Sequence, residues 1–246
     1  LFTATDDAGN LQPPKLNVLS LQESKGLNVD ELATHLAPHQ VQRATIAALV
    51  EAFEHAKTFG SLIQIPYALK THLGVLPEIL AKVRQSGDMY ANAAADDLLQ
   101  LVQQAQILAM QFDAVVANPP YMGGKYLTPT LKAYLKAEYS GYEKDLFSAF
   151  MIRDLALAKP SGQLGFMSPF VWMFISSYEK LRGFLLDQKT ITSLVQLEYS
   201  GFDGATVPIC TFTVANSHNP DFKGGYVRLS DFRGSENQAP KTREAI

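Results

Sequence analysis

The stretch Asn118-Pro119-Pro120-Tyr121 has residue types suited to chemistry on an amine. An exocyclic amine is a poor nucleophile, because its lone pair is delocalised into the ring or carbonyl that carries it. The Asn118 side-chain oxygen and the Pro119 carbonyl oxygen could accept hydrogen bonds from its two N–H groups. They would thereby favour the positive charge that develops on nitrogen as a methyl group arrives. Tyr121 would offer an aromatic face to a base flipped out of its helix. The alternative is an ordinary turn, since Asn and Pro are common turn residues.

The residues before this turn must position it. Residues 112–117 form a short apolar run rich in β-branched residues, which predicts a strand buried on both faces of a parallel sheet. Two prolines cannot continue a central strand, because neither offers an N–H to the sheet. The strand therefore ends at Asn118, and the side chain lies at the carboxyl end of the strand, where open α/β sheets bind ligands.

The rest of the chain predicts an α/β fold. A mostly helical block over 28–110 separates a candidate short strand at 15–21 from the strand at 112–117. After the turn, the order strand, helix, strand, helix, strand, loop, strand indicates a parallel sheet that ends in an antiparallel pair. The last segment, 234–246, is polar and is expected to lack a closing element. We expect helices at 131–139, 145–158 and 178–188, and strands at 163–168, 191–198 and 207–216.

Composition bears on the compartment of the protein and on how it could bind DNA. The 246 residues carry a net charge of -3 with one cysteine, Cys210, which fits a reducing cytoplasm without disulfides. No apolar run approaches the ~20 residues of a membrane span. A stand-alone DNA-binding domain is more often basic, so DNA contact would need a local basic patch. Lys132 and Lys136 are candidates for phosphate contact, and a solvated helix face explains them equally well.

Several segments, taken in order, resemble the gamma class of adenine-N6 DNA methyltransferases. Within that class the chain is most similar to the PglX methyltransferases of BREX phage-defence systems, from LFTATDD through SENQAPKT. NPPY alone is shared with glutamine and RNA amine methyltransferases, whereas the block over 162–214 is more particular. The segments are NPPY, the helix from Asp145 to Phe150, GQLGFMSPFVW, SYEKLRGFLL, ITSLVQLE and FDGATVPICTFTV.

The resemblance implies a Rossmann-like fold that binds S-adenosylmethionine and methylates adenine in double-stranded DNA for phage defence, with other BREX proteins as candidate partners. Asn118, Pro119, Pro120 and Tyr121 match the catalytic motif. Further positions carried over from the family are Phe202 as an aromatic on the flipped base, Phe150 as a ring on the cofactor adenine, and Ser20 as a weak cofactor contact. A loop aromatic tucked onto the core explains Phe202 as well, and core packing explains Phe150.

One departure from the family affects the expected activity. No Gly-x-Gly loop follows a strand, and the acidic residue that would bind the ribose lies upstream of Leu1 in the family. We therefore expect a partial methyltransferase sheet without its first two strands, in a truncated piece with little activity alone. The expected parts are 1–27 as the end of a cofactor-side half with its third strand, 28–110 as a helical segment, 111–216 as the catalytic half, and 217–246 as a tail leading to an absent target-recognition region.

Two other functions compete with adenine methylation. One is an amine methyltransferase acting on protein glutamine or RNA, and the other is a non-catalytic segment of a defence complex. A metal site is not expected: His35 and His39 have zinc-like spacing, but Pro38 lies between them and no acidic or cysteine partner is near in the sequence.

Overall fold

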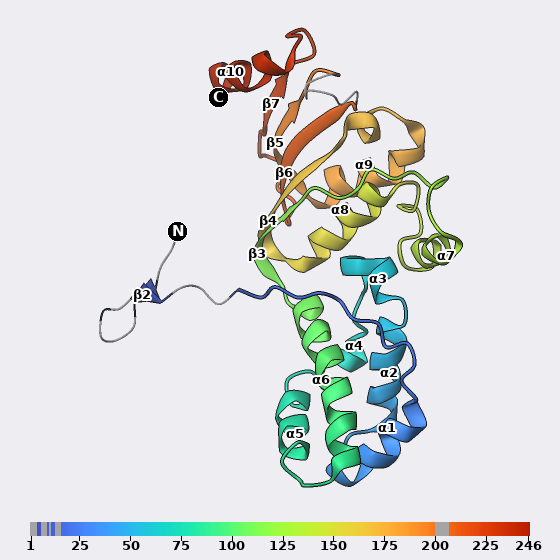
Figure 1. Ribbon diagram of the computed structural model, residues 1–246. Helices are drawn as coiled ribbons and strands as arrows, with labels where there is room; N and C mark the ends of the chain where they lie inside the picture. Colours follow the sequence, from blue (N-terminus) through green and yellow to red (C-terminus); the bar gives the residue numbers. More distant parts are fainter. Residues whose placement is uncertain (1–3, 6–8, 10, 13–15, 200–206) are drawn as a thin grey trace. The chain divides into compact units, whose positions relative to one another are not determined.

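The computed structural model describes all residues except 1–3, 6–8, 10, 13–15 and 200–206. The chain divides into two compact units, Leu1–Ala109 and Met110–Ile246, each with its own core (Figure 1). In the described ranges, no helix combines the length and apolar composition that a membrane span requires.

Unit 1 is helical because apolar residues recur at helical spacing and polar residues mark the helix starts. Asn28 caps the first helix, since its Oδ1 accepts from the backbone N–H groups of Asp30 and Glu31. Leu36, Ile46, Leu80 and other side chains form a core from which water is excluded. The elements are β1 (Ala4–Thr5), β2 (Leu11–Gln12), α1 (Val29–Leu36), η1 (Ala37–His39), α2 (Arg43–Phe53), α3 (Ala56–Phe59), η2 (Gly60–Leu62), α4 (Tyr67–Lys70), α5 (Leu76–Val83) and α6 (Met89–Ala109).

The strand expected over residues 15–21 does not form in its described part, which has no regular secondary structure. Leu16 and Val18 are 76% and 84% exposed, so these two side chains contribute nothing to the core, whereas Leu21 packs against it. Next to this segment, the backbone N–H of Gln22 instead donates to the side chain of Gln104 on α6. The prediction of a third sheet strand over residues 17–21 is therefore wrong.

Unit 2 is built on a five-stranded sheet in the order β3-β4-β6-β5-β7. β3 (Phe112–Ala117) pairs parallel with β4 (Ala158–Pro169), and β6 (Ile209–Ala215) is antiparallel to both β4 and β5 (Thr190–Gln196). β7 (Gly225–Arg228) pairs parallel with β5. The expected parallel sheet with an antiparallel last pair is thus confirmed, and β6 lies between two strands that run parallel to each other.

Two helices cover one face of this sheet (Figure 1). α8 (Leu146–Leu157) packs on β3 and β4, and α9 (Glu179–Gln188) packs on β5. Phe147 and Leu185 from these helices meet Leu164 and Phe212 from the sheet in one buried cluster. The remaining elements are α7 (Pro129–Glu138), η3 (Phe170–Met173), η4 (Ser176–Tyr178) and α10 (Ser235–Ala245).

The sequence predicts that β3 is buried on both faces, but in the structure only the face toward α8 is covered. Val115 and Ala117 point to the core, whereas Ala114 is exposed and Val116 is 84% exposed. The reason is the position of the strand: β3 has a neighbour on one side only, and α8 covers only the face that carries Val115.

The last thirty residues form more structure than expected. β7 extends the sheet beyond β5, and α10 spans most of the polar segment that was expected to lack a closing element. Gln238 on α10 is buried and connects the helix to the sheet end, because its side-chain oxygen accepts from the backbone N–H of Glu198. Long-range contact, rather than an apolar pattern, orders this segment.

Candidate active site

The Asn118–Tyr121 turn lies at the carboxyl edge of the sheet in unit 2. β3, β4 and β5 are parallel, so their carboxyl ends share one edge, and the antiparallel β6 begins there with Ile209 and Cys210. The Asn118–Tyr121 turn leaves β3 at this edge. The strand end agrees with the sequence prediction, since β3 ends at Ala117.

Two acceptor oxygens belong to successive residues of the turn, the Asn118 side-chain oxygen and the Pro119 carbonyl oxygen. Pro119 is buried and anchors the turn, while Asn118 next to it is exposed. The Tyr121 hydroxyl donates to Asn118 Oδ1 over 2.7 Å. The Pro119 carbonyl oxygen accepts no hydrogen bond from the part of the chain that the structure describes. An amide oxygen has two lone pairs, so both oxygens retain capacity to accept from a ligand.

Tyr121 is half-buried against the core of unit 2. Burial raises the pKa of its hydroxyl, and the neighbouring Cys210 adds to that effect. Cys210 is fully buried, and burial raises the pKa of its thiol to about 11. The Tyr121 hydroxyl therefore stays protonated at neutral pH and keeps its role as a hydrogen-bond donor, while Cys210 remains a neutral core residue.

Asp145 contacts the residue that follows the turn, a contact that the sequence does not predict. It caps α8, because Oδ1 accepts from the backbone N–H of Phe147 over 3.3 Å. The same oxygen accepts from the backbone N–H of Met122, over 3.1 Å, directly after the turn. An Asp before an apolar helix signals a cap, but nothing in the sequence pairs it with a loop 23 residues upstream.

The proposed cofactor-side residues are separated in the structure. Phe150 lies on α8 of unit 2, where it is half-buried and packed against the core. Ser20 is exposed in unit 1. Phe202 lies outside the described residues. The donor set thus fits the amine side of a methyl-transfer site. In the described ranges, no Gly-x-Gly loop follows a strand to cradle S-adenosylmethionine.

The remaining candidate residues, the two lysines of α7 and the histidines of unit 1, make no contact among the described residues that indicates a chemical role. Lys132 and Lys136 are exposed on α7, and neither makes an ion pair within the described ranges. His35 stacks on Tyr90 in unit 1, with ring centroids 5.4 Å apart. Among the described residues, no group of three His, Cys, Asp or Glu side chains is placed to hold a metal ion.

Comparison with known proteins gives the family. The chain is 37% identical over 242 residues to the adenine-specific methyltransferase BrxX of Escherichia coli O9:H4 (strain HS), covering 88% of this chain and 20% of that protein. It is 32% identical over 139 residues to the adenine-specific methyltransferase PglX of Lacticaseibacillus casei (strain Zhang), covering 55% of this chain and 12% of that protein. A solved structure of the Type ISP restriction-modification enzyme LlaGI, a nuclease-deletion mutant in complex with a DNA substrate mimic, matches with a TM-score of 0.46 and 14% identity, over 64% of this chain and 15% of that one.

The resemblance drawn from the sequence is confirmed by these relatives, and the chain spans about a fifth or less of their length. S-adenosylmethionine is the methyl donor of methylases of this kind. The model of the Eco57I restriction-modification methylase family matches residues 20–202, so the chain belongs to that family.

Proposed function

We propose that this chain is the amine-binding half of a site-specific DNA adenine-N6 methyltransferase that acts in phage defence. One observation carries the proposal: at the carboxyl end of β3, the exposed Asn118 is followed directly by Pro119, whose carbonyl accepts no hydrogen bond from the described residues. Adenine-specific methyltransferases among the relatives of the chain support the choice of adenine.

The two oxygens suit the reaction through hydrogen bonding. S-adenosylmethionine supplies an electrophilic methyl group on a sulfonium when it is bound. Asn118 Oδ1 and the Pro119 carbonyl accept from the two N–H groups of the adenine amine, which raises electron density on nitrogen and stabilises the positive charge that develops. The rigid prolines hold the carbonyl in place, and the half-buried Tyr121 ring, with Phe202 as a second aromatic, offers a surface for the flipped base.

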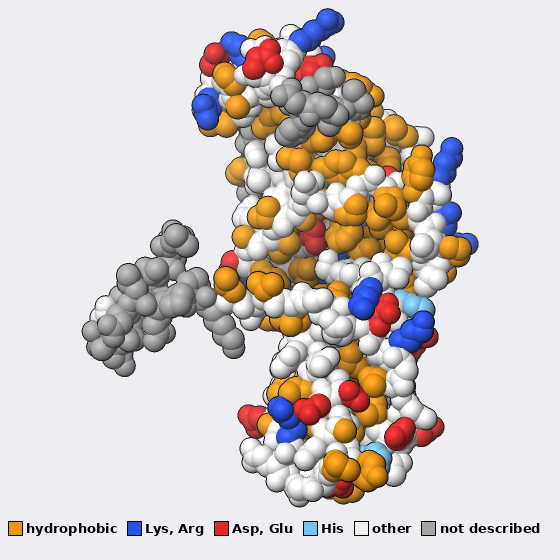
Figure 2. All heavy atoms as spheres, viewed as in Figure 1, with side chains coloured by type: hydrophobic (Ala, Val, Ile, Leu, Met, Phe, Trp, Pro, Cys, Tyr) orange, Lys and Arg blue, Asp and Glu red, His pale blue; other side chains and the backbone are white. Residues whose placement is uncertain are grey.

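The cofactor-binding half is proposed to come from residues outside 1–246. β3 is an edge strand, and Val116 on its outer face is exposed without a covering helix. Hydrophobic side chains also gather on the viewed surface of unit 2 (Figure 2). An exposed apolar strand edge is a template for further pairing. The chain alone is therefore expected to have little or no methyltransferase activity, with Phe150 and Ser20 as contacts that act only in the whole protein.

Double-stranded DNA is the proposed substrate, and other defence proteins of the BREX type are proposed partners. Lys132 and Lys136 are four residues apart on α7, so they lie on the same side of that helix, which follows the turn in sequence. Phosphate contact by these lysines would give an acidic chain the local basic patch that DNA binding requires. This use of the two lysines rests on their exposure and their closeness to the turn in sequence.

The molecule that accepts the methyl group distinguishes this function from the two alternatives. The full-length protein, meaning the longer polypeptide in which we propose that this chain occurs, is incubated with labelled S-adenosylmethionine and either duplex DNA, tRNA or protein. Label on adenine N6 of duplex DNA is expected. Label on tRNA or on protein glutamine would show that the enzyme methylates an amine other than that of DNA adenine. No transfer to any acceptor would favour a non-catalytic role in a defence complex.

A further inference from the structure

The segment after Tyr121 needs a restraint that the turn itself does not supply. Pro119 and Pro120 limit their own backbone angles. Met122, Gly123 and Gly124 follow, and two successive glycines allow the chain the widest range of directions. The hydrogen bond from the Tyr121 hydroxyl to Asn118 holds the side chain, whereas the backbone after Tyr121 needs a further contact to fix its direction.

Contacts with the start of α8 supply that restraint. Asp145 Oδ1 accepts from the Met122 N–H, and the Leu146 N–H donates back to the Met122 carbonyl over 3.2 Å. Gly123 forms an antiparallel bridge with Asp145, and the Gly124 N–H donates to the Lys144 carbonyl over 3.3 Å. Of these contacts, the one made by Asp145 Oδ1 is the only one that depends on a side chain.

A single oxygen atom thus joins two parts of the site. Asp145 Oδ1 holds the residue after Tyr121 and the first turn of α8, the helix that carries Phe150. The carboxyl group is half-buried, and burial raises its pKa. Hydrogen bonds from backbone N–H groups and the positive end of the helix oppose that effect and favour the carboxylate.

We propose that Asp145 is a positioning residue for the methyl-transfer site, which aligns the Asn118–Tyr121 turn with α8. The proposal rests on the proposed function. It assigns Asp145 no contact with substrate: the residue acts through Met122 on Tyr121, and through Phe147 on the helix that carries Phe150.

The test compares Asp145→Ala with Asp145→Asn. Alanine removes the acceptor, whereas the asparagine side-chain oxygen can accept from the same two N–H groups. In the full-length protein, Asp145→Ala is expected to lower kcat on duplex DNA by about ten-fold or more, since small misplacements of reacting groups have large effects on rate. KM for S-adenosylmethionine should change less than kcat, and Asp145→Asn should restore kcat to within about three-fold of the wild type.

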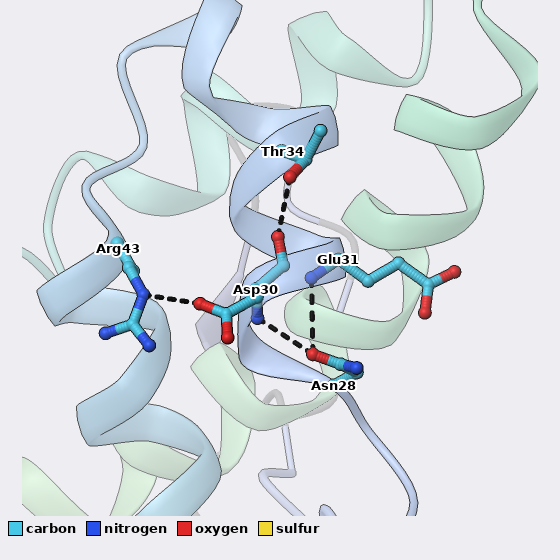
Figure 3. Close-up of polar contacts among 5 residues, drawn as sticks. All are labelled: Asn28, Asp30, Glu31, Thr34 and Arg43. Carbon is cyan, nitrogen blue, oxygen red and sulfur yellow. Dashed lines mark hydrogen bonds and ion pairs between the residues drawn. The ribbon is translucent and has the colours of Figure 1, made fainter.

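Asn28→Ala is the matched control, because Asn28 is also a helix cap whose one oxygen accepts from two backbone N–H groups, over 3.0 and 3.3 Å (Figure 3). Both groups belong to its own helix, so Asn28 holds no second segment. Asn28→Ala is expected to leave kcat unchanged. An equal fall in kcat for Asn28→Ala, or no rescue by Asp145→Asn, would overturn the positioning role.

A second readout separates this proposal from the proposed function. Amide hydrogen exchange of Met122 is measured in the 246-residue chain, where no activity is required. Asp145→Ala should speed the exchange of the Met122 amide by about ten-fold, and Asp145→Asn should not, because protection reports the hydrogen bond directly. Unchanged exchange in Asp145→Ala would refute the positioning role. Altered exchange in a full-length protein that methylates no DNA would refute the proposed function alone.

Discussion

Asp154, a buried residue of α8, should make the stability of unit 2 depend on pH. The side chain is 4% exposed, and burial raises the pKa of its carboxyl to about 7, although the neighbouring Arg153 lowers it. One carboxyl oxygen, Oδ2, has no hydrogen-bond partner among the described residues. A charge in this position is unfavourable, so Asp154→Asn is expected to change how stability depends on pH.

The sign follows from proton binding. The folded-state pKa of Asp154, about 7, lies above the ordinary value of 3.8, so the folded protein binds the proton more tightly than the unfolded chain. Stability should therefore fall as pH rises between those values, by about 1.4 kcal/mol per pH unit. Between pH 5 and pH 8 the wild type should lose roughly 2 to 3 kcal/mol from this group. Asparagine does not titrate in this range, so the variant should lose none of that amount.

Urea unfolding at pH 5, 6, 7 and 8 measures the difference. Trp172 is the one tryptophan and is buried in unit 2, so its fluorescence reports the unit that contains Asp154. The expected result is a free-energy difference between Asp154→Asn and wild type that grows in favour of the variant as pH rises. Asp113→Asn is the control, because that carboxylate is exposed beside Lys159. Parallel pH profiles for wild type and Asp154→Asn would refute the reasoning.

Two further predictions concern Tyr121 and Gly224. Tyr121→Phe keeps the ring and loses one hydrogen bond, so methylation by the full-length protein should fall by no more than about five-fold, on the scale of ~1 kcal/mol per hydrogen bond. Tyr121→Ala should lose more, since base stacking contributes ~1–3 kcal/mol, and equal kinetics for the two variants would exclude a role for the ring. Gly224→Ala should lower the melting temperature, because a Cβ would lie 2.6 Å from the Ile191 carbonyl oxygen, with a cost of roughly 1–3 kcal/mol. The control Gly225→Ala has nothing within 4 Å, and a similar loss there would contradict the steric argument.

Local sequence signals predicted the elements that depend on local chemistry. Proline fixed the end of β3 beside Asn118, and Asp145 marked the start of α8. Helix periodicity located α9 to within a few residues. These features depend on backbone restraints and apolar spacing, which a sequence displays directly.

The features that were missed depend on contacts between distant residues. Residues 16–21 have an apolar pattern, but the chain beside them bonds to Gln104 on α6 instead of joining a sheet. β7 and α10 are ordered by pairing with β5 and by the buried Gln238. Val116 is exposed because β3 lies at the edge of the sheet. The hydrogen bond between Asp145 and Met122 forms because the chain returns to the turn 23 residues later. No local pattern encodes any of these partners.

The central claim is that Asn118 supports methyl transfer to adenine N6. The most direct measurement is mass spectrometry of N6-methyladenine in duplex DNA treated with the full-length protein or its Asn118→Ala variant, under single-turnover conditions. We predict methyladenine with the wild type and a rate at least ~100-fold lower with the variant, which corresponds to ~2.7 kcal/mol of lost transition-state stabilisation. Equal rates for the two proteins would contradict the account.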